Sequence, residues 1–398
     1  MPTVYTQYSH TGNNAARKEK LFVLSHRIEL IPTPTQVVAF QKACGVARYT
    51  WNWALEQCEQ HYRETGEMAD LISLKRRWNR EKPSWVYESP RDANCQPFAE
   101  LAKAWKTFFR EKKKGNRKAG RPRFKKRGKC RDAFYVANYL FSINGSSVRL
   151  PVIGWMDMTE GLRFNGKILR GTVIREANRW FLSIAVEGDL SRERVGNEVT
   201  GVDLGVKTLA TLSTGESVHG PKPLKAAIKR LQRAQRWHSR KMKGSKNRAK
   251  SAMKLAQMHR RIKNIRQDAL HKLTTTLCRE NQTVVIEDLN VSGMLKNHSL
   301  ARSISDMGFY EFRRQLAYKA ELFGTRLIVA DRWYPSSKTC SCCGNVKREL
   351  ALSERTYHCG VCGLEIDRDL NAALNLRTLG YRGTHACGQT GAGATSVA

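Results

Sequence analysis

Four cysteines near the carboxyl end of the chain have the spacing of a metal site. Cys340 and Cys343 form one C-x2-C pair, and Cys359 and Cys362 form a second pair after a spacer of 15 residues. A glycine follows each pair, so a tight turn can present both thiolates of a pair on one face. Two such turns supply four soft ligands in a tetrahedron, which suits zinc and leaves no open position for water. The spacing predicts one structural Zn2+ in a zinc ribbon rather than four buried free thiols, and it leaves open an exchange of Cys342 into the ligand set.

Three acidic residues could bind a second kind of metal. Asp203 lies in the buried-type strand GVDLGV, Glu287 ends the strand TVVIE, and Asp369 begins a helix that continues into Asn-Ala-Ala. An unpaired carboxylate in a buried strand costs several kcal/mol, and a bound cation offsets that cost. Three carboxylates from separate elements can hold two Mg2+ ions about 4 Å apart, one activating water and one stabilising the leaving oxygen of a phosphodiester. This pattern predicts a nuclease centre of the RNase H-like type.

Each of these acids also has an ordinary structural explanation. Asp203 could be a satisfied structural acid, Glu287 a strand-end cap and Asp369 the N-cap of its helix. Their joint occurrence along the chain, in the order strand, hairpin, helices, strand and helix, favours the nuclease interpretation.

The elements that must position these residues follow from hydrophobic periodicity and from Gly and Pro punctuation. A polar amino-terminal segment and a Gly/Thr/Ser tail from Gly388 have no periodicity and are expected to be disordered. In the first half of the chain the pattern predicts a strand at 21–31, a helical unit at 35–110 with a largely tryptophan-lined core, and strands over 133–190 with a hairpin turn at 175–178. In the second half it predicts two strands from 198 and two helices, one on either side of Gly244. These are followed by a strand ending at Glu287, a helix at 308–323 and a further strand before the ribbon.

The charge of the chain points to a polyanionic partner. The 70 Lys and Arg residues outnumber the 35 Asp and Glu residues, which gives a formal charge of +35. Residues 112–131 hold 12 basic residues and no acid, and residues 218–267 hold 17 basic residues and no acid. A solvated charged surface is the alternative, but densities this high favour nucleic-acid phosphates.

No apolar run approaches the roughly 18 residues that span a bilayer, so an integral membrane protein is excluded. The remaining cysteines show no pairing pattern, and no signal peptide is evident, which together favour a reducing compartment. We therefore expect a cytoplasmic, nucleoid-associated protein of a prokaryote. The cysteines without a pairing pattern are Cys44, Cys58, Cys95, Cys130, Cys278 and Cys387.

Several stretches of the chain resemble the TnpB family of transposon-encoded, RNA-guided DNA endonucleases, which are related to type V CRISPR effectors. The match covers most of the chain. It includes GVDLGVKTLAT, VVIEDLNVSGM and SSKTCSCCG with YHCGVCGLEIDRDLNAALNL, which resemble the three RuvC motifs and the zinc ribbon, and RIELIPTPTQ, CGVARYTWNWAL and GRPRFKKRG towards the amino terminus. By this resemblance the second acid is Glu287 rather than Asp288, and the third is Asp369 rather than Asp367. The intact triad argues against the nuclease-dead repressors that descend from the family.

The resemblance implies an α+β multidomain fold, in which an RNase H-like RuvC nuclease domain with an inserted zinc ribbon accompanies a wedge-type β-barrel and a helical recognition unit. The implied boundaries are 1–40 and 125–195 for the wedge barrel, 41–124 for the recognition unit, 196–333 for the nuclease domain with a basic helical insert at 218–275, 334–366 for the ribbon, 367–382 for the third RuvC motif and 383–398 for a flexible tail.

The resemblance also implies the partners: a guide RNA, a double-stranded DNA target with a short adjacent motif, two catalytic Mg2+ ions and one Zn2+, in a monomeric ribonucleoprotein. Base pairing would then supply sequence specificity. A compact type V CRISPR effector and an RNA-guided DNA-binding repressor without cleavage stay open as alternatives. A guide-free transposase is disfavoured, because no separate DNA-binding motif such as a helix-turn-helix stands out.

Overall fold

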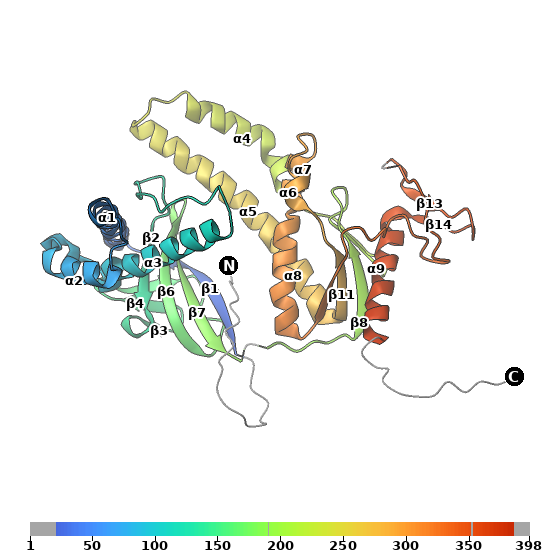
Figure 1. The fold of residues 1–398 in the computed structure, drawn as a ribbon, viewed down its shortest axis with the longest axis horizontal. Helices are drawn as coiled ribbons and strands as arrows, with labels where there is room; N and C mark the ends of the chain where they lie inside the picture. Colours follow the sequence, from blue (N-terminus) through green and yellow to red (C-terminus); the bar gives the residue numbers. More distant parts are fainter. Residues whose placement is uncertain (1–20, 190, 352, 386–398) are drawn as a thin grey trace, which may run out of the picture. The chain divides into compact units, whose positions relative to one another are not determined.

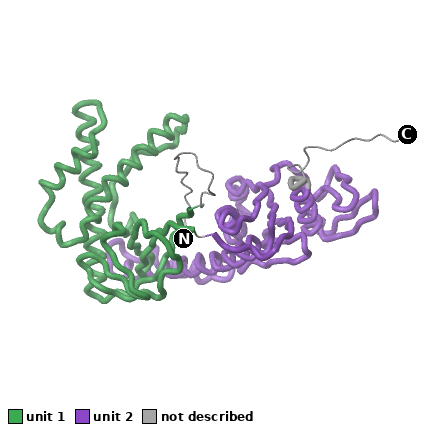
Figure 2. The backbone as a smooth tube through the Cα atoms, turned by 90° about the horizontal axis from the view of Figure 1, so that it is seen from below, with its two compact units in different colours: residues 1–190 green, residues 191–398 purple. Residues whose placement is uncertain are grey.

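The computed structural model describes residues 21–189, 191–351 and 353–385 of the 398-residue chain. The expectations for the first 20 residues and for the tail from Gly388 concern segments outside these ranges. The chain divides into two compact units, residues 1–190 and 191–398, which Figure 2 distinguishes by colour. Within the described residues, no helix is long and apolar enough to cross a membrane.

A seven-stranded antiparallel sheet forms the base of the first unit. Strand β1 (Phe22–Ile31) buries every second side chain, as its alternating sequence predicts, and pairs with β7 from Phe22 opposite Gly188 to Leu30 opposite Trp180. The expected hairpin turn lies at Ala177 and Asn178 between β6 and β7. The strand order is β2-β6-β7-β1-β5-β4-β3, so among the described residues β2 and β3 are the outer strands of an open ladder. The other strands are β2 (Ala133–Ala137), β3 (Ser142–Asn144), β4 (Ser147–Leu150), β5 (Gly154–Met158), β6 (Lys167–Glu176) and β7 (Arg179–Gly188).

The predicted helical unit is inserted between β1 and β2. Its first helix begins with a capping box, in which the Thr33 hydroxyl accepts from the Gln36 backbone and the Gln36 side chain accepts from the Thr33 backbone. The expectation that most tryptophans pack in the core is confirmed for Trp51, Trp78 and Trp105, which are all buried, whereas Trp85 is 44% exposed. The helices are α1 (Pro34–Thr65), α2 (Leu71–Glu81) and α3 (Arg91–Lys113), with short 3-10 turns η1 (Ser84–Glu88) and η2 (Asn138–Leu140).

The second unit is built around a five-stranded mixed sheet of order β10-β9-β8-β11-β12. Three of its strands, β8, β11 and β12, run parallel to one another. Strand β9 pairs antiparallel with β8 and forms a hairpin with β10. The strands are β8 (Glu198–Asp203), β9 (Ala210–Leu212), β10 (Ser217–Val218), β11 (Asn281–Glu287) and β12 (Arg326–Ala330).

Helices cover both faces of this sheet: α9 lies on one side, and α5 with α8 lies on the other (Figure 1). The two predicted basic helices are α4 and α5, and Gly244 takes the left-handed conformation between them. The helices are α4 (Pro223–Ser239), α5 (Lys246–Glu280), α6 (Val291–Met294), α7 (Ala301–Met307), α8 (Phe309–Phe323) and α9 (Arg368–His385). The two-stranded ribbon of β13 (Thr356–His358) and β14 (Glu365–Asp367) leads directly into α9.

Candidate functional site

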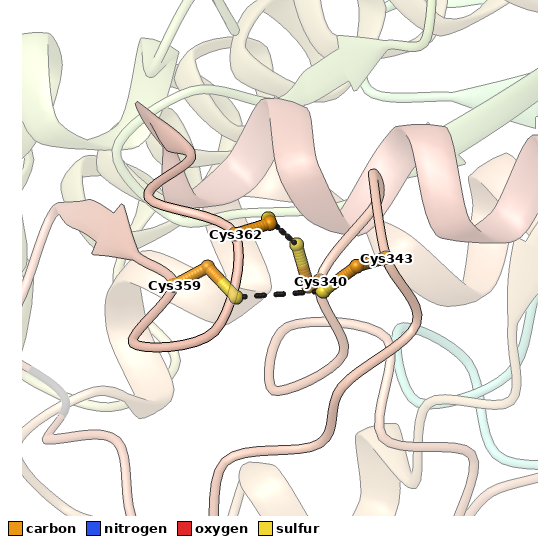
Figure 3. A group of neighbouring side chains, drawn as sticks. All are labelled: Cys340, Cys343, Cys359 and Cys362. Carbon is orange, nitrogen blue, oxygen red and sulfur yellow. Dashed lines mark hydrogen bonds between the residues drawn. The ribbon is translucent and has the colours of Figure 1, made fainter.

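The four predicted zinc ligands gather into one cluster (Figure 3). Their ligand atoms all lie within 4.8 Å of one another. Among the described residues, no other group of three or more His, Cys, Asp or Glu side chains meets this criterion. The group consists of Cys340, Cys343, Cys359 and Cys362. The Sγ atoms of Cys340 and Cys362 lie 3.6 Å apart, as do those of Cys343 and Cys359. Thiolates about 2.3 Å from zinc at tetrahedral angles are about 3.8 Å apart, so the cluster has the size of a zinc site. Cys342 is exposed and lies outside the group.

Each cysteine pair lies on its own backbone turn, and the two turns have the same hydrogen-bond pattern. In the first turn the N–H of Cys340 donates to the carbonyl of Asn345 at 2.8 Å, and the N–H of Gly344 donates to the carbonyl of Cys340 at 3.0 Å. The second turn repeats these bonds at the same distances around Cys359. Gly344 and Gly363 have φ of 76° and 73°, a conformation that side chains rarely adopt, which explains the glycine after each pair.

The thiols of the cluster do not ionise alike. Backbone N–H groups of Cys362 and Val361 lower the pKa of the Cys359 thiol to about 6. The N–H of Asn345 favours the Cys343 thiolate, but local desolvation and the three neighbouring thiols outweigh it and raise the pKa of this exposed thiol to about 12. Four thiolates this close repel one another unless a cation lies between them, and Zn2+ is the cation that prefers four sulfur ligands. The donor set therefore fits zinc.

The three predicted carboxylates meet at one edge of the five-stranded sheet. Because β8 and β11 are parallel and pair Val202 with Ile286, Asp203 and Glu287 end neighbouring strands at the same edge. Asp369 lies in the first turn of α9, which packs on β8. That packing is very close at Gly201, where a Cβ would lie 2.0 Å from the carbonyl oxygen of Ala373 on α9. Glycine at this position lets α9 bring its first turn to the acidic edge.

The electrostatics of the centre favour a cation. Burial, followed by the negative charges of Glu287 and Asp369, raises the pKa of Asp203 to about 8. Within the described residues, none of these three carboxylates forms an ion pair, and the more distant charge of Arg368 only partly offsets the rise in the pKa of Asp203. Their oxygens are not all within 4.8 Å of one another, which is wider than one shared ion requires. Carboxylate oxygens are the ligands that Mg2+ prefers in proteins.

The two neighbouring acids have other partners. Arg313 and Arg332 both bond the Asp288 carboxylate, the latter at 2.7 Å, and these bonds lower its pKa. Asp367 accepts from the backbone N–H groups of Asp369 and Leu370 at 2.9 and 3.0 Å, so it is the residue that caps α9. The capping role considered for Asp369 therefore falls to Asp367, which leaves the Asp369 carboxylate available for other ligands.

Sequence reasoning missed a buried hydroxyl beside the acidic centre. Ser336 is 3% exposed and its Oγ donates to Oε1 of Glu287. The residue follows Tyr334 and Pro335, just before the first cysteine pair. A serine after a proline is typical of an ordinary turn, so its residue type did not indicate a role at the acidic centre. The one feature of the sequence that could have indicated it is the position of Ser336 between the last strand of the sheet and the ribbon.

Both basic stretches form defined surfaces rather than free tails. The 112–131 stretch is held to α1 at Lys125, whose backbone N–H donates to Asn52 at 2.7 Å and whose ammonium lies 3.8 Å from the Trp51 ring centroid. The α4–α5 pair is fixed at its base by buried Asp306, which accepts from the first N–H groups of α4 and pairs with Arg266 at 3.3 Å. Most other basic side chains in both stretches remain exposed to solvent.

Three family profiles match parts of the chain. One described as "Probable transposase" (OrfB_IS605) matches residues 182–298, and one described as "Cas12f1-like, TNB domain" matches residues 309–376. A third, described as "Helix-turn-helix domain", matches residues 23–67. The third match corrects the expectation that no helix-turn-helix motif stands out, although these residues form β1 and the single continuous helix α1.

Curated relatives match almost the whole chain. A Streptomyces pristinaespiralis protein named "Putative RNA-guided DNA endonuclease" is 38% identical over 369 residues, covering 90% of this chain and 89% of the relative. InsQ of Escherichia coli (strain K12), which carries the same description, is 34% identical and covers 91% of this chain and 93% of the relative. A cryo-EM structure of a Cas12f1-sgRNA-target DNA complex matches with a TM-score of 0.53 at 14% identity, over 86% of this chain and 83% of that chain, which is a likeness of fold alone.

Proposed function

Because the chain belongs to the TnpB family of RNA-guided DNA endonucleases, we propose that it cleaves double-stranded DNA next to a short target-adjacent motif, directed by a bound guide RNA and using one RuvC-type centre. One observation carries the assignment of that centre: Asp203, Glu287 and Asp369 converge at one sheet edge, and none of them forms an ion pair with a described residue. Like charges held together in a partly buried site are costly unless a metal binds them.

The three carboxylates would hold two Mg2+ ions. When bound, these ions would supply an activated water and stabilise the leaving oxygen of the phosphodiester. The chain's own contribution is geometric: parallel β8 and β11 fix Asp203 and Glu287 side by side, and the close contact of α9 at Gly201 places Asp369 beside them. Ser336 orients Glu287, and the arginines on Asp288 keep that acid out of the centre.

We assign the four cysteines one structural Zn2+ and the second unit an RNase H-like RuvC fold with the ribbon inserted. The order of its elements supports this fold: β8 with Asp203, the β9–β10 hairpin, helices α4 and α5, β11 with Glu287, and then α9 with Asp369. For the first unit, the antiparallel sheet interrupted by helices supports the wedge-type barrel and recognition unit, with the domain boundaries given above.

The two basic surfaces would hold nucleic-acid backbones. The 112–131 stretch and the α4–α5 pair carry exposed Lys and Arg side chains on anchored scaffolds, which suits phosphates of the guide RNA and of the RNA–DNA heteroduplex. Sequence specificity would come from base pairing, and the protein would recognise helix shape and the short motif. We expect one protein chain per ribonucleoprotein.

Sequencing the RNA that co-purifies with the protein, expressed from its native locus, tests this function. We expect one structured RNA species that ends in a variable segment. Replacing that segment should redirect Mg2+-dependent cleavage to plasmids that carry the matching sequence beside a fixed short motif. The genomic origin of the RNA distinguishes the two kinds of nuclease. An RNA from a transposon end indicates a transposon-encoded endonuclease, and an RNA from a CRISPR array indicates a compact type V effector.

Two results would contradict the proposal. A heterogeneous mixture of cellular RNA would mean that the +35 charge merely collects polyanions, because no guide would be selected. Specific binding of the matched target without any cleavage would support the RNA-guided repressor instead. The matched control is a plasmid with the same target and a scrambled flanking motif, which should stay intact.

A further inference from the structure

A chain of hydrogen bonds joins the zinc ribbon to the acidic centre through the short segment 336–341. This segment leaves the sheet after β12 and reaches the first ribbon turn at Cys340. At its start, the buried Ser336 hydroxyl donates to Glu287. At its end, the backbone N–H of Ser341 donates to Oδ1 of Asn371 on α9 at 3.0 Å. The segment therefore touches two of the three elements that carry the carboxylates.

Two buried asparagines of α9 hold this segment in place. The Asn371 side chain, fully buried, donates to the carbonyl of Thr339 at 2.7 Å. The Asn375 side chain, 4% exposed, donates to the same carbonyl at 2.6 Å and to the carbonyl of Ser336 at 2.8 Å. Both asparagines lie on the helix whose first turn carries Asp369. Buried amides that satisfy specific backbone carbonyls fix geometry, because misplacing them leaves polar groups without partners.

The segment is also tied to the ribbon itself. The Tyr357 hydroxyl of β13, from a fully buried ring, donates to the carbonyl of Lys338 at 3.1 Å. Cys340, the first sulfur of the cluster, follows closely and is 1% exposed. Folding of the ribbon therefore fixes the same backbone that presents Ser336 to Glu287.

We propose that Ser336, Asn371 and Asn375 are positioning residues that couple the folded ribbon to the acidic centre by fixing the Glu287 carboxylate relative to Asp203 and Asp369. The inference rests on the proposed metal-dependent nuclease. The hydroxyl occupies one oxygen of Glu287, so the carboxylate keeps one orientation, in which its charge acts on Asp203. Groups that orient metal ligands in this way typically change metal affinity about 10- to 100-fold.

Manganese binding measures the coupling without any guide or target. Full-length, zinc-loaded protein is titrated with Mn2+, and free Mn2+ is followed by electron paramagnetic resonance. We expect Ser336→Ala to raise the Mn2+ dissociation constant about tenfold. The matched control is Ser337→Ala, because in the described structure the neighbouring hydroxyl of Ser337 makes no hydrogen bond. Ser336→Thr, which keeps a hydroxyl, should recover most of the affinity.

The asparagines extend the test to the coupling itself. Asn375→Ala touches no carboxylate, yet it should weaken Mn2+ binding while zinc content stays at one ion per chain. The double variant Ser336→Ala/Asn375→Ala should bind Mn2+ with the same affinity as the single variant that binds it less tightly. The two losses do not add, because both substitutions act through the orientation of Glu287. Additive losses would overturn a shared route, and so would Asn375→Ala with unchanged Mn2+ affinity.

Other outcomes separate this proposal from the function on which it rests. Wild-type protein without Asp203-dependent Mn2+ binding would overturn both the metal centre and the coupling. A wild type that binds Mn2+ beside a Ser336→Ala variant of equal affinity would overturn the coupling alone. A lower melting temperature with unchanged affinity would likewise reduce Ser336 to a packing role. Cleavage titrated with Mg2+ provides a second measurement: the half-saturating Mg2+ concentration should rise in Ser336→Ala, and saturating Mg2+ should restore most of the rate.

Discussion

The zinc ribbon and the acidic centre bind metals through ligands that the chain encodes in opposite ways. The four sulfurs come from two copies of one local turn, and each turn is closed by its own backbone hydrogen bonds. The three carboxylates come from two parallel strands and a helix that are far apart in the sequence. A local site can form wherever its short segment folds, whereas the acidic centre exists only when the whole sheet has assembled. Substitutions at the two sites should therefore have different consequences.

The largest expected effect is at Asp203. We expect Asp203→Asn to reduce Mg2+-dependent cleavage by a factor on the order of 10^3 or more, because the variant loses a metal ligand at the reacting centre. Guide-RNA binding should change little. Metal-free stability near neutral pH should not fall, because Asp203 is already protonated and uncharged below its pKa of about 8, and the amide is a neutral group of similar size. Cleavage kinetics with a fixed guide and thermal melting measure the two effects.

The control for Asp203 is Asp288→Asn. Asp288 sits next to Glu287 in sequence, but two arginines hold it on the outside of the centre. We expect near-normal cleavage from this variant. Full cleavage by Asp203→Asn, or equal losses in both variants, would contradict the assignment of the triad.

Loss of zinc should unfold the zinc ribbon without unfolding the sheet. We expect Cys359→Ser to lose zinc and to increase hydrogen exchange in residues 334–366, because four ligands in one small segment supply most of its folding energy. Cleavage should fall about 10- to 100-fold through the misplaced carboxylates, while exchange in β8 and β11 stays slow. The exposed Cys342, outside the cluster, is the matched control as Cys342→Ser. Equal zinc content and equal melting in the two variants would rule out the cysteine ligand set.

A substitution at Gly201 should damage only the non-local site. An added methyl group would meet the Ala373 carbonyl and the Arg377 backbone nitrogen, at 2.0 and 2.5 Å, so α9 must move away from β8. We expect Gly201→Ala to lower the free energy of unfolding by about 1–3 kcal/mol and to reduce cleavage, with zinc content unchanged. Urea unfolding and metal analysis test this.

The control glycine is Gly45, which lies inside α1, where an added methyl group would have no atom within 4 Å. Gly45→Ala should leave cleavage unchanged and should stabilise the protein by up to about 1 kcal/mol, since alanine favours a helix. A Gly201→Ala variant that behaves like Gly45→Ala would show that the close approach of α9 is not required.

The same contrast explains what could be predicted from the sequence. The helices, the strands and the cysteine spacing follow from local periodicity and turn chemistry, which act over a few residues. The identity of the acids was accessible because a charged residue in an apolar strand is conspicuous. The roles of Ser336, Asn375 and Gly201 were not accessible, because each depends on which distant backbone packs against it. Nothing in the sequence around Asp306 indicates that its buried carboxylate caps α4, because the two segments lie far apart in the chain.

The acidic centre should respond to pH through Asp203. Without metal, the folded protein keeps the Asp203 proton up to a pKa of about 8, whereas the unfolded chain releases it near 3.8. Because the folded state binds the extra proton between these values, the stability of the metal-free protein should fall as the pH rises through this window.

Metal binding must displace that proton, so the pH dependence of affinity has the opposite sign. We expect Mg2+ or Mn2+ affinity to increase about tenfold per pH unit between about pH 6 and 8 and to level off above the pKa of Asp203. The slope should disappear in Asp203→Asn, which has no proton to release. It should persist in Asp288→Asn, because the wild-type Asp288 carboxyl, whose pKa is lowered by its two arginines, does not titrate in this range. Metal titrations at several pH values give the result. A slope that survives in Asp203→Asn would place the titrating group elsewhere and would contradict the assignment of the displaced proton to Asp203.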